Sequence, residues 1–219
     1  MKIRAIITGA TGMVGEGVLL TCLAHPDVEA VLVINRKSGG VTHPKLREIV
    51  HTDFYDLTPI ASELSGYNAC FFCLGVSSVG LSAEEYQRIT YDLTLHVAEV
   101  LAGLNAEMTF CYVSGAGTDS SEKGRSRWAR VKGATENALM RVFKNAYMFR
   151  PGFMKEVAGQ KNIKSFYRYI AWLYPIGRVL YGAGFCTLEE VGKAMIHVAQ
   201  RGYAKKILEV KDIVEAAAE

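Results

Sequence analysis

The stretch Thr8-Gly9-Ala10-Thr11-Gly12-Met13-Val14-Gly15 decides the fold of this chain of 219 residues. It follows an apolar, β-branched run from residue 3 to residue 7 and precedes apolar residues at helical spacing, which predicts a buried strand, a turn and a helix. In such a turn Gly9 allows the tight bend, Gly12 lets a pyrophosphate approach the backbone, and Gly15 lets the helix pack on the sheet. The pattern therefore predicts a dinucleotide site, in which backbone N–H groups from Thr11 to Val14, including that of Met13, face the diphosphate.

The residues after the second predicted strand, 28–35, indicate which dinucleotide is preferred. A carboxylate at this position typically binds the ribose 2′-hydroxyl of NAD, whereas an arginine accommodates the 2′-phosphate of NADP. Here the chain has Arg36 and Lys37 and no carboxylate. Because a guanidinium pairs with phosphate through two hydrogen bonds, we expect NADP(H) to be preferred, with NAD(H) as the alternative. The competing interpretation is that both cations are solvated loop residues.

Predicted strands and helices alternate along nearly the whole chain. Further strands are expected at 46–50, 68–74, 108–113, 146–149 and 207–210, and helices at 82–104, 127–143 and 187–200. Ser82 and Thr187 carry the sequence signature of helix N-caps. Such alternation requires a parallel sheet that is covered by helices on both faces. We therefore predict an α/β fold with a doubly wound parallel sheet, a Rossmann fold, as a single NAD(P)-binding domain over residues 1–219.

Other cofactor contacts are expected where the strands end, because ligands of open α/β sheets bind beyond the carboxyl ends of the strands. Asp53 is placed to accept a hydrogen bond from the adenine amino group. The fourth strand ends at Leu74 and Gly75, where a small residue lets the cofactor ribose lie against the backbone. Pro151 and Gly152 follow the sixth strand and complete the predicted edge.

Residues 153–184 interrupt the alternation. Four basic side chains of this segment are interleaved with six aromatic ones. Three interpretations remain open: a flap on the substrate side, an amphipathic patch at 161–181 for peripheral contact with a membrane or a partner, or ordinary helical packing with solvated cations.

Composition narrows the class of function. A net charge of +3 requires neither nucleic acid nor an anionic membrane as a partner, and no apolar stretch is long enough to span a bilayer. The histidines lack metal-ligand spacing, so no metal site is predicted. Five cysteines without disulfide spacing, and no visible secretory signal, lead us to expect a reducing, cytoplasmic location.

Three stretches resemble the atypical short-chain dehydrogenase/reductase family: residues 8–15, Val113-Ser114-Gly115 and Arg150-Pro151-Gly152. The chain is most similar to the small members described as nucleoside-diphosphate-sugar epimerase-like, including the Tat-interacting-protein-like branch. The resemblance implies an NAD(P)H-binding protein with a serine at the end of the fifth strand and a Tyr-xxx-Lys pair on the next helix. In such proteins the tyrosine is the general acid/base, the serine orients the substrate, and the lysine lowers the tyrosine pKa and holds the nicotinamide ribose.

Carried onto this sequence, the resemblance implies that Ser114 and Lys132 are the catalytic residues, but Trp128 occupies the tyrosine position. An indole can donate a hydrogen bond and has no accessible acid/base pKa. Two functions therefore stay open: an NADP(H)-dependent oxidoreductase on a small carbonyl substrate, or a catalytically impaired NADPH-binding regulatory or interaction protein. Sugar epimerisation is less favoured, because full-length epimerases carry an additional C-terminal substrate lobe. A tyrosine from elsewhere (Tyr86, Tyr167, Tyr174 or Tyr181) is the other candidate proton donor.

Overall fold

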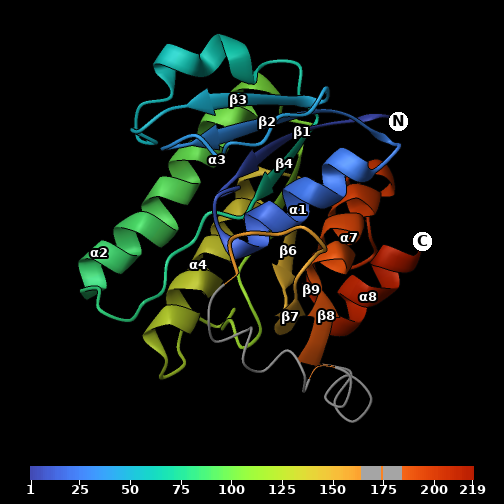
Figure 1. Ribbon diagram of the computed structural model, residues 1–219. Coiled ribbons are helices and arrows are strands. Elements are labelled where there is room, and N and C mark those ends of the chain that lie inside the picture. Colours follow the sequence, from blue (N-terminus) through green and yellow to red (C-terminus); the bar gives the residue numbers. More distant parts are fainter. Residues whose placement is uncertain (164–173, 175–183) are drawn as a thin grey trace.

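The computed structural model describes residues 1–163, 174 and 184–219, and its centre is a seven-stranded parallel sheet (Figure 1). The strand order is β3-β2-β1-β4-β5-β6-β9, so the predicted doubly wound Rossmann fold is confirmed. The strands are β1 (Ile3–Thr8), β2 (Val28–Asn35), β3 (Leu46–Val50), β4 (Ala69–Phe72), β5 (Thr109–Val113), β6 (Ala146–Arg150) and β9 (Ile207–Glu209). Their apolar character on both sides matches a sheet that is covered on both faces.

Helices form a layer on each face of this sheet (Figure 1). One layer contains α1 (Met13–Ala24), α7 (Leu188–Arg201) and α8 (Val210–Ala218). The other contains η1 (Thr58–Leu64), α2 (Ala83–Gln87), η2 (Arg88–Asp92), α3 (Leu93–Leu104) and α4 (Arg127–Val142). Each layer buries its own apolar cluster, so that successive residues of one strand contribute to different clusters: Ile7 belongs to the first and Ile6 to the second.

The chain reverses its direction of winding at β1. Thr8, the last residue of β1, pairs with Ile34 of β2 on one side and with Phe72 of β4 on the other. The chain reaches β2 through α1 on one face, whereas β4 is followed by helices on the opposite face. The connections therefore diverge beyond the carboxyl end of β1, which leaves the crevice where such sheets bind ligands.

The predicted capping residues start their helices as expected. The Ser82 hydroxyl accepts from the Glu85 N–H, and the Glu85 carboxylate accepts from the Ser82 N–H. Thr187 and Glu190 form the same reciprocal pair at the start of α7. These boxes satisfy N–H groups that would otherwise lack partners in the first helical turn.

The structure departs from the prediction in two places. The helix predicted at 82–104 is divided by a π-helical turn, η2, which separates α2 from α3. A short parallel pair, β7 (Phe153–Lys155) with β8 (Phe185–Thr187), brackets the segment that interrupts the alternation. Most of the predicted flap at 153–184, and of the aromatic–basic stretch at 161–181, lies outside the described residues.

Candidate functional site

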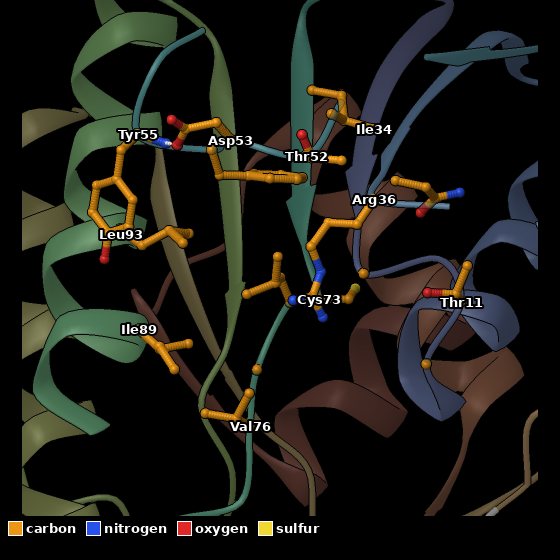
Figure 2. Close-up of a pocket in the computed structure, with 16 residues that line it drawn as sticks. Thr11, Ile34, Arg36, Thr52, Asp53, Tyr55, Cys73, Val76, Ile89 and Leu93 are labelled. Carbon is orange, nitrogen blue, oxygen red and sulfur yellow. Dashed lines mark hydrogen bonds between the residues drawn. The ribbon is translucent and has the colours of Figure 1, made fainter. Parts of the chain in front are cut away.

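A cavity of about 410 Å³ opens at the carboxyl edge of the sheet, where β1, β2, β3 and β4 end (Figure 2). Its floor is the glycine-rich turn after β1, and its far wall comes from η2 and the start of α3. Its sixteen lining residues are Gly9, Thr11, Gly12, Ile34, Asn35, Arg36, Thr52, Asp53, Phe54, Tyr55, Cys73, Leu74, Gly75, Val76, Ile89 and Leu93. Seven of the predicted cofactor residues are among them: Gly9, Thr11, Gly12, Arg36, Asp53, Leu74 and Gly75.

The glycines of the turn differ in what they allow. Gly9 has a φ of +71°, and a Cβ there would lie 2.7 Å from the Leu74 backbone nitrogen. A Cβ on Gly15 would lie 2.2 Å from the carbonyl oxygen of Gly9, so helix and turn touch at this point. Gly12 faces the cavity and precedes α1 as its N-cap without any side-chain cap. The first turn of α1, with Met13 buried beneath it, therefore presents its backbone toward the cavity, and this arrangement fits a diphosphate.

Arg36 extends its guanidinium into the middle of the cavity (Figure 2). In the part of the chain that the structure describes, this guanidinium has no ion-pair or hydrogen-bond partner. Lys37 is exposed and does not line the cavity. Of these two neighbouring cations, only Arg36 therefore lines the cavity.

Glu48 of β3 fixes the loop that follows Arg36. Its carboxylate accepts hydrogen bonds from the Asn35 side chain at 2.7 Å, the Ser38 hydroxyl at 2.6 Å and the Gly39 N–H at 2.8 Å. Partial burial opposes its ionisation, but these donors outweigh that effect and lower the pKa of Glu48. The nearest carboxylate to the end of β2 is therefore engaged by its own loop.

Asp53 and Tyr55 form the wall opposite the glycine turn (Figure 2). One carboxylate oxygen of Asp53 accepts the Tyr55 N–H at 2.9 Å. The Tyr55 hydroxyl donates to the carbonyl of Arg88 at 2.6 Å, which ties this wall to η2. Asp53 is thus on the cavity surface, with its orientation set by the turn that follows β3.

Ser114 lies at the end of β5 but faces the interior. Its hydroxyl donates to Glu136 Oε1 at 2.5 Å, and the carbonyl oxygen of Phe149 is the more distant acceptor at 3.2 Å. Arg150 binds the same carboxylate through Nε at 3.0 Å and Nη2 at 2.5 Å. This network is buried, so the predicted catalytic serine is held inside the protein rather than on the wall of the cavity.

Lys132 lies next to the cavity, one helical turn beyond Trp128 on α4. Its ammonium donates to the Val113 carbonyl at 3.3 Å, and a Cβ built on Gly75 would lie 4.0 Å from its Nζ. Burial lowers the pKa of Lys132 to about 8, although the nearby Glu136 carboxylate acts in the opposite direction.

The remaining predicted residues do not line the cavity. Val14 lies in the first turn of α1 and packs partly against the apolar cluster below. The Pro151 carbonyl accepts from the Ala116 N–H, and a Cβ on Gly152 would lie 2.3 Å from the Gly184 carbonyl oxygen. Pro151 thus joins the loops beyond β5 and β6, and Gly152 packs against the residue that precedes β8.

Two of the four tyrosines considered as alternative proton donors lie among the described residues. Tyr86 is buried at the start of the helical wall, and Tyr174 packs on Phe153 and Phe185. Tyr167 and Tyr181 lie outside the described residues.

Several cavity residues were not predicted from the sequence. Tyr55 follows Asp53 in the loop after β3, so its position beyond a strand end is the signal that could have identified it. Ile89 and Leu93 lie within 82–104, for which the sequence predicts one regular helix. The π-helical turn adds a residue to the helical repeat, and both side chains line the cavity, with Leu93 also packed partly against the second apolar cluster (Figure 2).

Comparison with known proteins identifies the family to which this chain belongs. Residues 5–126 match the model of the NAD dependent epimerase/dehydratase family, which is more than half of the chain. The chain belongs to this family. The resemblance to atypical short-chain dehydrogenases/reductases is thereby confirmed.

Curated relatives and solved structures of other proteins show what this chain is similar to. Protein fmp52-2, mitochondrial, from Aspergillus terreus is 27% identical over 68% of this chain and 66% of its own length. Protein FMP52-1, mitochondrial, from Scheffersomyces stipitis is 24% identical over 96% of this chain and 97% of its own length. The Bordetella bronchiseptica enzyme WbmF, solved in complex with NAD+, has a TM-score of 0.67 at 17% identity, covering 99% of this chain and 77% of WbmF. At that identity the likeness to WbmF concerns the fold.

These relatives correct the predicted compartment. The expectation of a cytoplasmic location is wrong, because the names of the curated relatives place those proteins in mitochondria. Cysteines without disulfide spacing indicate only that no disulfide framework is expected, and a secretory signal is only one kind of targeting segment, so neither observation identifies the cytosol. None of the helices in the described ranges is long and apolar enough to cross a membrane.

Proposed function

We propose that this protein is an NADP(H)-dependent oxidoreductase that acts on a small carbonyl substrate. The observation that carries the cofactor choice is Arg36, whose guanidinium enters the cavity without an anionic partner among the described residues. Arg36 is exposed in the absence of a ligand, and a phosphate beside the ribose would give its guanidinium a partner for two charge-assisted hydrogen bonds. Glu48, the carboxylate nearest this loop, is engaged by three donors and does not compete for the guanidinium.

The rest of the cavity supports a complete dinucleotide. The diphosphate would lie over Gly12 and the start of α1, and the adenine would lie between Ile34 and the wall formed by Asp53 and Tyr55. The nicotinamide end would then approach Gly75 and Lys132. When bound, the nicotinamide would supply a hydride to the substrate carbonyl.

The cofactor part of this proposal is tested by titrating NADPH and NADH against the protein and its Arg36→Ala variant, followed by cofactor fluorescence. NADPH should bind more tightly than NADH to the parent protein, because a charge-assisted contact contributes about 1.5–3 kcal/mol, or about tenfold to a hundredfold in affinity. The variant should lose that difference. Lys37→Ala is the matched control, since this neighbouring cation does not line the cavity, and its affinities should match those of the parent. Equal affinities of the parent protein for both cofactors would overturn the assignment.

A second function is favoured by a specific observation. Trp128 replaces the usual tyrosine and Ser114 faces Glu136, so neither of these groups offers a proton to a substrate in the cavity. The alternative proposal is a protein that binds NADPH and reports its level to a partner. Oxidation of NADPH by the parent protein with any of a panel of aldehydes and quinones would exclude it. Activity that appears only in Trp128→Tyr would support it.

A further inference from the structure

One face of α4 carries three side chains with polar groups, spaced four residues apart: Trp128, Lys132 and Glu136. Each meets a different neighbour. The Trp128 ring lies against Gly117, where a Cβ would be 3.5 Å from the indole, and Glu136 is engaged by the buried Arg150. Only Lys132, between them, has its polar group next to the cavity.

The ammonium of Lys132 is only partly satisfied. It has three N–H donors, and the Val113 carbonyl takes one of them at the long distance of 3.3 Å. The ring of Tyr112 lies below it, with Nζ 5.5 Å from the ring centroid. No carboxylate lies within ion-pair distance of Lys132 in the described residues. Two donors therefore remain for a group that enters beside Gly75.

Among the residues that the structure describes, two titratable groups bear on Lys132. Glu136 comes from its own helix and favours the ammonium form, whereas burial disfavours that form more strongly. Tyr112 comes from β5, and its own pKa is raised by burial, so it stays neutral at physiological pH. The net result is a pKa of about 8, which allows Lys132 to give up a proton near neutral pH.

We propose that Lys132 is the proton donor of the reaction, in place of the missing tyrosine; this inference rests on the proposed function. The carbonyl carbon of the substrate gains a hydride and its π bond breaks, with the electron pair moving to oxygen. The Nζ–H bond of Lys132 then breaks as its proton forms the O–H bond of the alcohol. The neutral amine regains a proton from water, so the residue is unchanged after each turnover.

Two substitutions separate proton donation from charge. Lys132→Arg keeps a cation with hydrogen-bond donors but cannot release a proton near neutral pH, and Lys132→Met removes both properties. The probes are para-nitrobenzaldehyde and phenanthrenequinone, with NADPH oxidation measured from pH 6 to 10. A general acid contributes about 10²–10⁴-fold, so both variants should lose at least about a hundredfold in kcat. Lys123→Arg, on an exposed lysine of the loop before α4, is the control and should keep the parent rate.

The pH profile and a measurement without cofactor complete the test. Because the acid must be protonated, kcat of the parent should fall as the pH rises above about 8. Heteronuclear NMR of the lysine side chains, assigned with the Lys132→Arg variant, should show one lysine titrating near that value in the cofactor-free protein.

Three outcomes would overturn the inference. Lys132→Arg could retain the parent kcat and pH profile, which would make Lys132 a positioning residue. Lys132 could titrate near 10.4 like an exposed lysine. The parent could bind NADPH but reduce neither probe, which would remove this inference while leaving the proposed cofactor intact. Failure to bind NADPH at all would instead overturn the proposed function, so the two failures are distinguishable.

Discussion

The hydroxyl of Ser114 and the carboxylate of Glu136, 22 positions apart in the chain, form a hydrogen bond in the interior of the protein. The carboxylate is fully buried and also receives two donors from Arg150. Arg150 in turn reaches Glu209 at 3.1 Å and the Ser120 hydroxyl at 2.6 Å. The network thus joins α4, β6, β9 and the loop after β5, and it takes the serine away from the cavity.

Breaking this network should be costly. Glu136→Gln leaves the Arg150 guanidinium largely buried without its main anion, and the loss of one partner of a buried pair typically costs about 3–5 kcal/mol. Glu209 remains as a second anion, so we expect the lower end of that range. Urea denaturation measures the change in the free energy of unfolding.

An exposed ion pair of the same kind is the control for Glu136→Gln. Glu29 pairs with Arg4 at 2.9 Å, but its side chain is 54% exposed. Glu29→Gln should therefore change the free energy of unfolding by no more than about 1 kcal/mol. Similar losses for both substitutions would contradict the structural role given to the buried network.

The contact between helix α1 and its preceding turn gives a second prediction. Gly15→Ala would place a methyl group 2.2 Å from the Gly9 carbonyl oxygen, so helix and turn must separate. Overpacking of this kind costs about 1–3 kcal/mol, and the displaced backbone should also weaken NADPH binding by at least about tenfold. Thermal unfolding and cofactor titration measure the two effects.

Gly103→Ala is the matched control for that substitution. Gly103 lies in α3, and a Cβ there meets nothing within 4 Å. Alanine is favoured over glycine in a helix, so this variant should be stabilised by up to about 1 kcal/mol, with unchanged NADPH affinity. If Gly15→Ala behaved like Gly103→Ala, the close packing of helix on turn would be refuted.

The lowered pKa of Lys132 makes stability depend on pH in a direction that can be worked out. Between about 8 and the ordinary value near 10.5, the unfolded chain binds a proton at this residue that the folded protein has released. Stability therefore rises with pH in that window and is independent of this residue's titration below it. The difference in free energy of unfolding between the parent and Lys132→Met should be constant up to about pH 8 and then increase in favour of the parent.

Lys123→Met provides the reference for that measurement, because Lys123 is exposed. Its difference from the parent should stay flat over the same pH range. A flat difference for Lys132→Met as well would mean that the Lys132 ammonium is not destabilised by its surroundings.

The features that could be predicted from the sequence are those set by neighbouring residues. The glycine turn, the bounds of β2 and β3 and the capping boxes at Ser82 and Thr187 depend on short stretches, and the structure has them where the sequence placed them. The direction of the Ser114 hydroxyl depends instead on Glu136 and Arg150, which only the folded chain brings together.

The helical wall of the cavity likewise depends on contacts between residues that are distant in the sequence. An amphipathic pattern over 82–104 fits a regular helix, and nothing in that spacing indicates the π-helical turn. The extra residue is tolerated where the Arg88 carbonyl receives both the Leu93 N–H and the Tyr55 hydroxyl, and Tyr55 comes from a distant loop. Tertiary contacts therefore determine this part of the site.

The π-helical turn divides one helical stretch into two parts, α2 before it and α3 after it. Ile89, within the turn, and Leu93, directly after it, border the cavity, whereas Val97 and Leu101 further along α3 are fully buried against the sheet. Leu93 also packs partly against the apolar cluster that α3 buries, whereas Ile89 belongs to neither apolar cluster, so a substitution at Ile89 should disturb the hydrophobic interior less than one at Leu93. Ile89 is thus the natural position at which to redesign what the ligand chamber admits while the durability of the scaffold is kept.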